Sequence, residues 1–149
     1  MRRYFLDSSA LFKRYLEEDG TERVLEIMRQ NNELIVSRLT MVEVFSAGAR
    51  LARAGDISQE LLSDLFSAVE NDFREEFTVV ELGGAAMVRS MDLVRAHGLR
   101  AADAIQLACA VMVAGESSTS SEFTFVCSDN ELNSAAEKEG MTVLDPQRS

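Results

Sequence analysis

Short, nearly continuous runs of apolar residues alternate along this chain with longer segments in which apolar residues recur every three or four positions. The short runs are typical of strands that are buried on both faces, and the longer segments are typical of helices with one buried face. The expected strands cover residues 3–7, 34–36, 77–82, 123–128 and 141–144. The expected helices cover residues 8–16, 21–31, 39–54, 58–75, 84–97, 101–114 and 130–139. This alternation predicts an α/β fold with a parallel sheet covered on both faces.

Serine residues stand where three of the helices are expected to begin, and a serine hydroxyl accepts hydrogen bonds from the backbone N–H groups that open a helix. These caps are Ser8 or Ser9, Ser37 and Ser58. The segment GESSTSSE, residues 115–122, is expected to form a polar loop that is too short to join two domains. We therefore expect residues 1–149 to form a single domain.

The composition fits one globular domain, with 149 residues of which 46% are hydrophobic and 27% are charged. No apolar run reaches the roughly 18 residues that a membrane-spanning helix needs, and the N-terminal apolar run is too short for a signal peptide. Cys109 and Cys127 lie in apolar runs, so we expect buried, reduced thiols, a cytoplasmic location and no membrane association. The net charge of −10 opposes nonspecific binding to nucleic acid, which relies on lysine and arginine.

Four acidic residues stand inside apolar sequence, where a carboxylate is costly to bury without a compensating charge. They are Asp7, Glu43, Asp103 and Asp129. The chain has only two lysines and one histidine, and most of its arginines lie outside the apolar sequence around these four acids. Four carboxylates with few cations nearby indicate a hard divalent metal ion, which prefers oxygen ligands.

The expected elements bring these acids to one edge of the sheet. Asp7 and Asp129 stand at the carboxyl ends of expected strands, and the active crevice of an open parallel sheet lies beyond these ends. Asp103 and Glu43 stand in the first turns of their helices. Simpler roles exist for each acid, since Asp7 and Asp129 can cap helices, Asp103 can compensate a helix dipole, and Glu43 can extend to solvent. The joint placement of all four favours a shared site.

Each of the four acids lies in a longer segment, and the order and spacing of these four segments are specific. The segments are FLDSSALFKRYLEEDG, SRLTMVEVFSA, LRAADAIQLACA and FVCSDNELNSAAEKEGMTVLDP. From Tyr4 to Pro146 the chain resembles the PIN-domain ribonucleases, and among them the VapC-type toxins of prokaryotic toxin–antitoxin pairs. This resemblance implies a three-layer α/β/α fold with strand order 3-2-1-4-5, in which Asp7 and Asp129 are neighbours. It also implies an endoribonuclease that depends on Mg²⁺ or Mn²⁺, forms homodimers and is inhibited by a protein antitoxin.

Asp7, Glu43, Asp103 and Asp129 match the acidic quartet of the family. We assign Asp7 as a direct metal ligand, with Asp103 and Asp129 completing direct or water-mediated contacts to one or two ions. Glu43 orients or deprotonates the attacking water.

Three further residues of the matched segments bear on the site. Ser9 matches a hydroxyl position that supports it. Arg100 either contacts a phosphate of the substrate or forms a salt bridge at the start of its helix. Cys127 departs from the threonine that is frequent in the family, which affects a supporting hydrogen bond and not the ligands.

Two other classes of function are open. A noncatalytic binding module on the same fold would need none of the four acids. A phosphatase or a receiver domain also has an aspartate after its first strand, but it needs a lysine near the site, and neither Lys13 nor Lys138 follows an expected strand. The phosphatase pattern has a second aspartate two residues after the first, where this chain has Ser9.

The helices at 21–31 and 58–75 carry more apolar positions than a small sheet face needs. The clearest excess is Leu61, Leu65, Phe66 and Phe73. Apolar anchors at helical spacing suit a groove that takes an antitoxin helix, as the resemblance implies. The alternative is that these residues pack against their own sheet or against a second copy of the chain.

Overall fold

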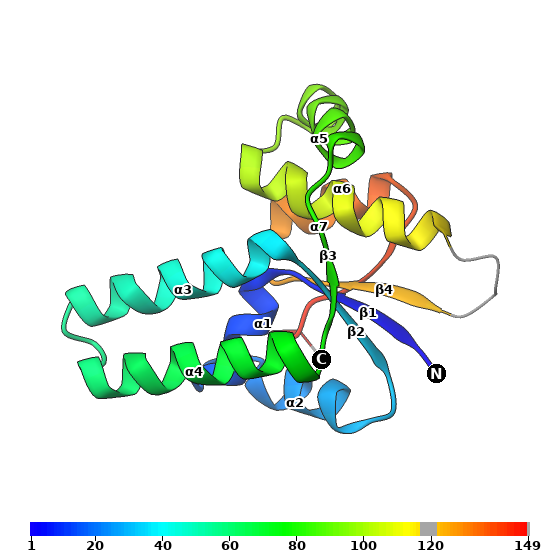
Figure 1. Cartoon of the computed structure of the whole chain (residues 1–149). Coiled ribbons are helices and arrows are strands. Elements are labelled where there is room, and N and C mark those ends of the chain that lie inside the picture. Colours follow the sequence, from blue (N-terminus) through cyan, green and yellow to red (C-terminus); the bar gives the residue numbers. More distant parts are fainter. Residues whose placement is uncertain (117–121, 149) are drawn as a thin grey trace.

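Strand β1 lies at the centre of a five-stranded parallel sheet in a computed structural model that describes residues 1–116 and 122–148 (Figure 1). The strands are β1 Arg3–Leu6, β2 Glu33–Ser37, β3 Thr78–Val80, β4 Phe123–Val126 and β5 Thr142–Leu144. Their order, β3-β2-β1-β4-β5, confirms the predicted sheet. Because the order reverses between β1 and β4, the carboxyl ends of these two strands form the point where such sheets bind ligands.

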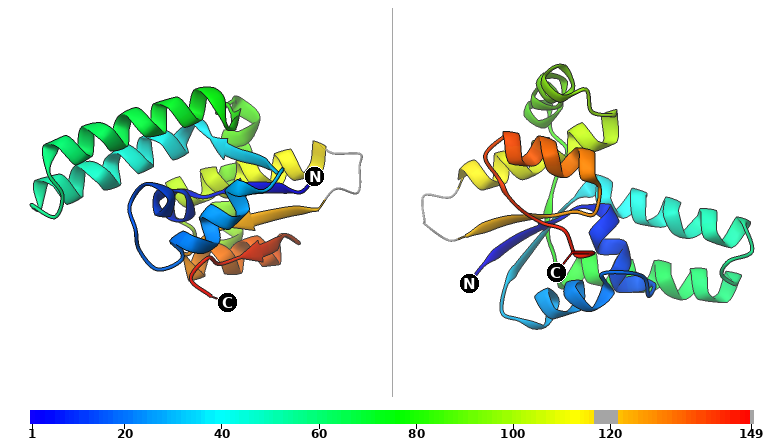
Figure 2. Two further views of the ribbon diagram at one scale, coloured as in Figure 1. Left: turned by 90° about the horizontal axis from the view of Figure 1, so that it is seen from below. Right: turned by 180° about the vertical axis from the view of Figure 1, so that it is seen from behind.

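Seven helices cover the two faces of the sheet in the described part of the chain and complete the three-layer α/β/α fold (Figure 2). They are α1 Ser8–Tyr15, α2 Thr21–Arg29, α3 Arg38–Arg53, α4 Gln59–Glu75, α5 Gly84–His97, α6 Ala101–Glu116 and α7 Asn130–Lys138. Helices α1 to α4 share one apolar core with the sheet, and α5 to α7 share the other.

Alternate residues of the central strand enter these two cores. Phe5 is fully buried against α5, α6 and α7, and it stacks on Phe125 of β4. Tyr4 and Leu6 enter the core that is shared with α1 to α4. A strand that buries both faces reads as a continuous apolar run, and this is why the sequence pattern located β1 correctly.

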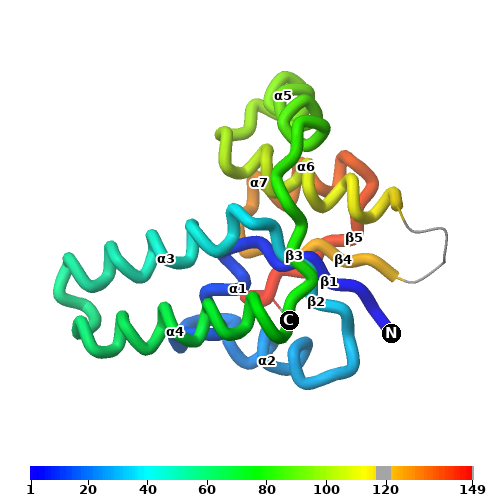
Figure 3. Tube along the Cα trace, viewed as in Figure 1, coloured from blue at the N-terminus to red at the C-terminus, as the bar shows by residue number. Residues whose placement is uncertain are grey.

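Helices α3 and α4 pack against each other and extend side by side away from the sheet (Figure 3). Phe45 of α3 stacks on Phe66 of α4, with ring centroids 4.1 Å apart. Leu65 and Phe73 are buried in the core of the chain itself, so their assignment to an apolar excess on the surface is wrong. Leu61 alone of the four is exposed, at 41%.

The boundaries differ from the expected ones by a few residues. The expected loop at 115–122 begins too early, because α6 continues to Glu116; residues 117–121 lie outside the described part of the chain. The strands β1, β3 and β4 each end before the expected last residue, since the chain turns into a helix or loop there. The caps at Ser37 and Ser58 are confirmed, and His97 ends α5 with Gly98 in the left-handed region behind it.

Within the described residues, no single helix is both long and apolar enough to cross a membrane. Helices α5 and α6 pass that test only as a pair, across a bend of 115°.

Candidate active site

Asp7 occupies the carboxyl end of β1, where the order of the strands reverses. Its backbone N–H donates to the carbonyl oxygen of Val126 at 3.0 Å, which continues the pairing of β1 with β4. Its side chain caps α1 by accepting from the backbone N–H of Ser9 at 3.1 Å. The cap expected at Ser8 or Ser9 is therefore wrong, because Ser8 is already the first residue of the helix.

Ser9 and Cys127 tie the carboxylate of Asp7 to the loop that follows β4. Ser9 Oγ donates to Asp7 Oδ2 at 2.7 Å and accepts from the backbone N–H of Ser128 at 3.0 Å. The thiol of Cys127 lies 3.5 Å from Asp7 Oδ2, and its sulfur accepts from the backbone N–H of Asp129 at 3.3 Å. The cysteine thus contacts two of the four acids, so the supporting contact at this position is retained with a cysteine.

Asp129 and Asp103 approach the same edge from the starts of two helices. Asp129 caps α7, with Oδ1 accepting from the backbone N–H of Leu132 at 3.0 Å. Asp103 lies in the first turn of α6, and its Oδ2 is 3.7 Å from Nε of Arg100. The Arg100 side chain is largely exposed, and an exposed ion pair adds little stability. The geometry therefore supports the salt bridge and leaves the guanidinium accessible to a substrate.

Glu43 is held by a buried polar network between α3 and α6. Gln106 of α6 is fully buried, and its Nε2 donates to Glu43 Oε1 at 2.7 Å. Ser37 Oγ donates to Gln106 Oε1 at 2.8 Å, and Ser37 also forms a capping box with Thr40 at the start of α3. The network therefore fixes the Glu43 carboxylate relative to the carboxyl end of β2.

The structure brings all four acids to one cleft of about 560 Å³. Its lining includes Asp7, Ser9, Glu43, Arg100, Asp103 and Asp129. Burial raises the pKa of the Asp7 carboxyl, and the hydrogen bonds from Ser9 oppose this shift. Burial also raises the pKa of Glu43 and of Asp103, and the negative charge of Asp7 raises both further. The cleft is thus a site of mutually repelling carboxylates.

The chemistry of this donor set fits a hard divalent cation, which would compensate both the burial and the repulsion of the carboxylates. Within residues 1–116 and 122–148, no three acidic, cysteine or histidine side chains are gathered closely enough to enclose an ion by themselves. Asp7, Glu43 and Asp129 each accept a hydrogen bond from the protein through one carboxylate oxygen. Such a site suits Mg²⁺, which keeps several water ligands and takes only one or two carboxylates.

Comparison with known proteins identifies the family. Residues 4–138 match the family described as PIN domain. The chain belongs to this family. Among its relatives, Ribonuclease VapC45 of Mycobacterium tuberculosis (strain CDC 1551 / Oshkosh) is 34% identical over 109 residues, which are 73% of this chain and 75% of the relative.

Solved structures share the PIN-domain fold over nearly the whole chain. FitAcB from Neisseria gonorrhoeae has a TM-score of 0.72 at 17% identity, and the match covers 98% of this chain and 99% of that one. A toxin-antitoxin complex from Klebsiella pneumoniae has a TM-score of 0.64 at 16% identity, covering 96% of this chain and 97% of the other. At these identities the likeness shows the fold. Membership of the PIN-domain family sets aside the phosphatase and receiver alternatives.

The sequence pattern alone does not reveal two polar residues of the PIN-domain site. Gln106 is the only polar residue besides Asp103 in the apolar segment 101–114, and that isolation is the signal that could have found it. Lys13 lines the acidic cleft although it is only 2% exposed, and its Nζ lies 2.9 Å from Glu18 Oε1. Lys13 lies within α1 and does not follow a strand, so its position in the sequence does not predict that it lies near the acids.

Proposed function

We propose that this PIN domain is a metal-dependent endoribonuclease that hydrolyses phosphodiester bonds of RNA. The observation that carries the proposal is the placement of Asp7, Glu43, Asp103 and Asp129 around one cleft at the point where the strand order reverses. The name of the VapC45 relative, a ribonuclease, supports the choice of RNA. On a chain with a net charge of −10, substrate phosphates require the ion and local arginines such as Arg100.

Each residue of the cleft has a distinct part in the proposed reaction. Asp7 would bind Mg²⁺ or Mn²⁺ directly, Asp103 and Asp129 would complete direct or water-mediated contacts, and Ser9 would orient Asp7. When bound, such an ion neutralises charge on the phosphate oxygens and lowers the pKa of water.

Glu43 accepts the proton of the attacking water. Gln106 keeps the Glu43 carboxylate in position, and burial together with the charge of Asp7 raises its pKa, which increases its affinity for that proton. The water oxygen forms a bond to phosphorus while the bond from phosphorus to the leaving ribose oxygen breaks, and Arg100 contacts a phosphate oxygen.

The proposal is tested by cleavage of a labelled single-stranded RNA with Mg²⁺, with Mn²⁺ and with EDTA. Wild type is expected to cleave only with an ion, and Asp103→Asn and Asp129→Asn are expected to lower the rate by about 100-fold or more. Asp64→Asn is the matched control, because Asp64 is an exposed acid of α4 outside the cleft. Cleavage that persists in EDTA, or that survives both substitutions in the cleft, would contradict the proposal.

We propose further that residues 1–149 form one nuclease domain that acts in the cytoplasm as a homodimer and is inhibited by an antitoxin. A toxin-antitoxin complex among the structural neighbours supports the antitoxin. Cys109 and Cys127 are buried free thiols, as a reducing compartment favours. Size-exclusion chromatography with light scattering tests the dimer, and copurification with the product of the adjacent gene tests the antitoxin.

A further inference from the structure

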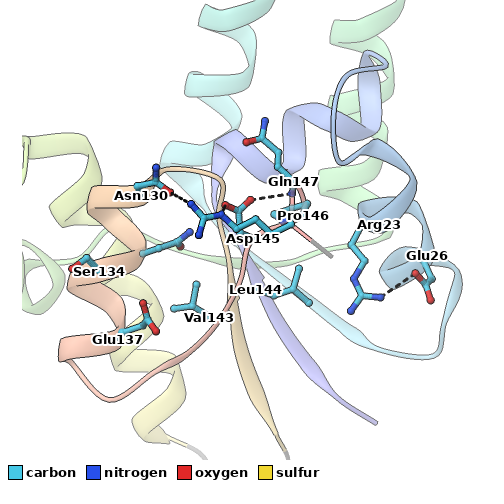
Figure 4. Close-up of a pocket in the computed structure, with 12 residues that line it drawn as sticks. Arg23, Glu26, Asn130, Ser134, Glu137, Val143, Leu144, Asp145, Pro146 and Gln147 are labelled. Carbon is cyan, nitrogen blue, oxygen red and sulfur yellow. Dashed lines mark hydrogen bonds and ion pairs between the residues drawn. The ribbon is translucent and has the colours of Figure 1, made fainter.

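A second cleft, of about 1090 Å³, adjoins the acidic one, and the proposed reaction does not use it. It lies between α2, α7 and the segment that follows β5 (Figure 4). Gln147 lines both clefts, and Asn130 of the second cleft directly follows Asp129 of the acidic one. A chain molecule with one bond at the four acids can therefore continue into the second cleft.

Arg148 presents a positioned guanidinium to the second cleft. Its Nε lies 3.5 Å from Asp145 Oδ2, and its Nη2 donates to Asn130 Oδ1 at 3.2 Å. Its side chain is nevertheless 72% exposed. A guanidinium carries five N–H donors in a fixed plane, so these two contacts orient the group and still allow it to bind a phosphate.

Arg23 of α2 offers a second cation on the opposite wall of the cleft (Figure 4). Its Nη1 lies 3.1 Å from Glu26 Oε2, and both side chains are exposed. An exposed ion pair of this kind is weak, so a phosphate can replace Glu26 as the partner of Arg23. Although Glu26, Glu137 and Asp145 also line the cleft, two of these acids hold its arginines.

The wall of the cleft is held in place by close packing. A Cβ on Gly20 would lie 3.0 Å from the carbonyl carbon and oxygen of Pro146, so the turn that carries Arg148 rests directly on a glycine. Asn133, another lining residue, is buried, and its Nδ2 donates to the carbonyl oxygen of Cys127 at 2.8 Å. Its Oδ1 is buried without a hydrogen-bond partner in the described part of the chain, which is unfavourable unless a ligand or water supplies a donor.

From these observations we infer that the second cleft binds the nucleotides of single-stranded RNA that adjoin the bond being cleaved. Arg148 and Arg23 contact phosphates of the bound strand. The inference deepens the proposed function and rests on it for the identity of the ligand. Arg148 and Arg23, the two arginines of the cleft, would pair with phosphates beyond the four acids, although three carboxylates line the same cleft.

The test compares an RNA of about ten nucleotides with a dinucleotide that spans only the cleaved bond. Arg148→Ala and Arg23→Ala are each expected to raise the Kd of the longer RNA about tenfold, since each loses a charge-assisted contact. The slope of log K against log salt concentration should become shallower by about 0.7 per lost contact. The preference in kcat/KM for the longer RNA over the dinucleotide should fall by the same factor. Arg74→Ala is the matched control, because the Arg74 side chain is 66% exposed and lies in α4 outside both clefts.

Binding is measured by fluorescence anisotropy in EDTA, so that it does not depend on cleavage. If wild type binds the longer RNA and the arginine variants bind it equally well, the second cleft is not an RNA site, whether or not RNA is cleaved. If the arginine variants bind more weakly but wild type cleaves no RNA with either ion, the result supports the second cleft as an RNA site and contradicts the proposed reaction. If wild type does not bind the RNA at all, the inference is overturned.

Discussion

Gln106 Nε2 and Glu43 Oε1 lie 2.7 Å apart, in a hydrogen bond that joins α6 to α3. The amide of Gln106 is fully buried, and its oxygen accepts from Ser37 Oγ at 2.8 Å. Since Ser37 also caps α3, one side chain connects the start of that helix with the carboxylate proposed to accept a proton. A buried amide that is satisfied at both ends is favourable, and its removal costs each partner one buried hydrogen bond.

Gln106→Leu is therefore expected to affect both stability and activity. The substitution removes the hydrogen bonds of Gln106 to Glu43, Ser37 and Thr40, which should lower the free energy of unfolding by about 2 kcal/mol or more. RNA cleavage should fall by about 10- to 100-fold, because a positioned carboxylate loses its orientation. Urea denaturation and single-turnover cleavage measure the two effects. Gln59→Leu, at an exposed position of α4, is the control, and wild-type cleavage by folded Gln106→Leu would refute a positioning role.

Asp7→Asn separates the charge of Asp7 from its structural role. Asparagine caps a helix about as well as aspartate, so the start of α1 is preserved. RNA cleavage should be abolished, whereas the thermal stability of the metal-free protein should be equal or higher, because burial opposes the negative charge at this position. Asp7→Ala is the control, since it removes the cap as well as the charge. It should be less stable than Asp7→Asn by about 1 kcal/mol. Wild-type nuclease activity in Asp7→Asn would make the proposed mechanism wrong.

The pH dependence of that comparison follows from the direction of the pKa shift. The pKa of Asp7 is raised in the folded protein, so the folded state binds the proton more tightly than the unfolded state does. The charge destabilises the fold at pH values above the folded pKa, and this effect disappears as the pH falls towards the unfolded value of about 3.9. In EDTA, the gain in melting temperature of Asp7→Asn over wild type should therefore be largest near pH 8 and shrink on acidification. A gain that grows towards low pH would contradict a raised pKa.

The sequence alone predicted the strands of the sheet and the edge of the sheet that carries the acids. Apolar runs located each strand; Asp7 follows β1 directly, and Asp129 follows β4 after Cys127 and Ser128. Gln106 could not be placed by the same reasoning. Its partners Glu43 and Ser37 lie 63 and 69 positions away in the sequence, so only the packing of α3 against α6 shows that its amide is paired. Periodicity reveals that a polar residue is buried, but not which residue satisfies it.

The apolar stripe of α4 shows a related limit. The spacing of Leu65 and Phe73 correctly predicts one apolar face on this helix. It does not reveal what covers that face, and here α3 and the rest of the core bury both side chains. The exposed Leu61 lies outside this buried stripe, so the surface open to a partner is smaller than the sequence suggested.

Gly20→Ala tests the contact between the turn before α2 and the C-terminal turn. Gly20 has a φ of 96°, which costs an alanine about 1–2 kcal/mol. Its new Cβ would also meet the Pro146 carbonyl at 3.0 Å, so the total loss of unfolding free energy should exceed that conformational cost. Gly55→Ala is a matched control, because Gly55 has a φ of 80° with no atom within 4 Å of the Cβ position. If chemical denaturation gives equal losses of unfolding free energy for Gly20→Ala and Gly55→Ala, the contact with Pro146 adds nothing to the cost of the substitution.

Leu61→Asp tests whether the α3–α4 pair contributes to an inhibitor interface. The exposed Leu61 side chain can accept a charge without unfolding the chain, whereas Leu65→Asp would place a charge in the core and is unsuitable. If the product of the adjacent gene inserts an apolar helix face here, Leu61→Asp should weaken its inhibition of RNA cleavage about tenfold or more, because apolar anchors carry most of such binding energy. Nuclease activity without the inhibitor should stay at the wild-type level, since Leu61 lies outside the acidic cleft. Leu82→Asp provides the comparison, being similarly exposed but located between β3 and α5. Inhibition that is equal in wild type and Leu61→Asp would exclude this part of α4 from the interface.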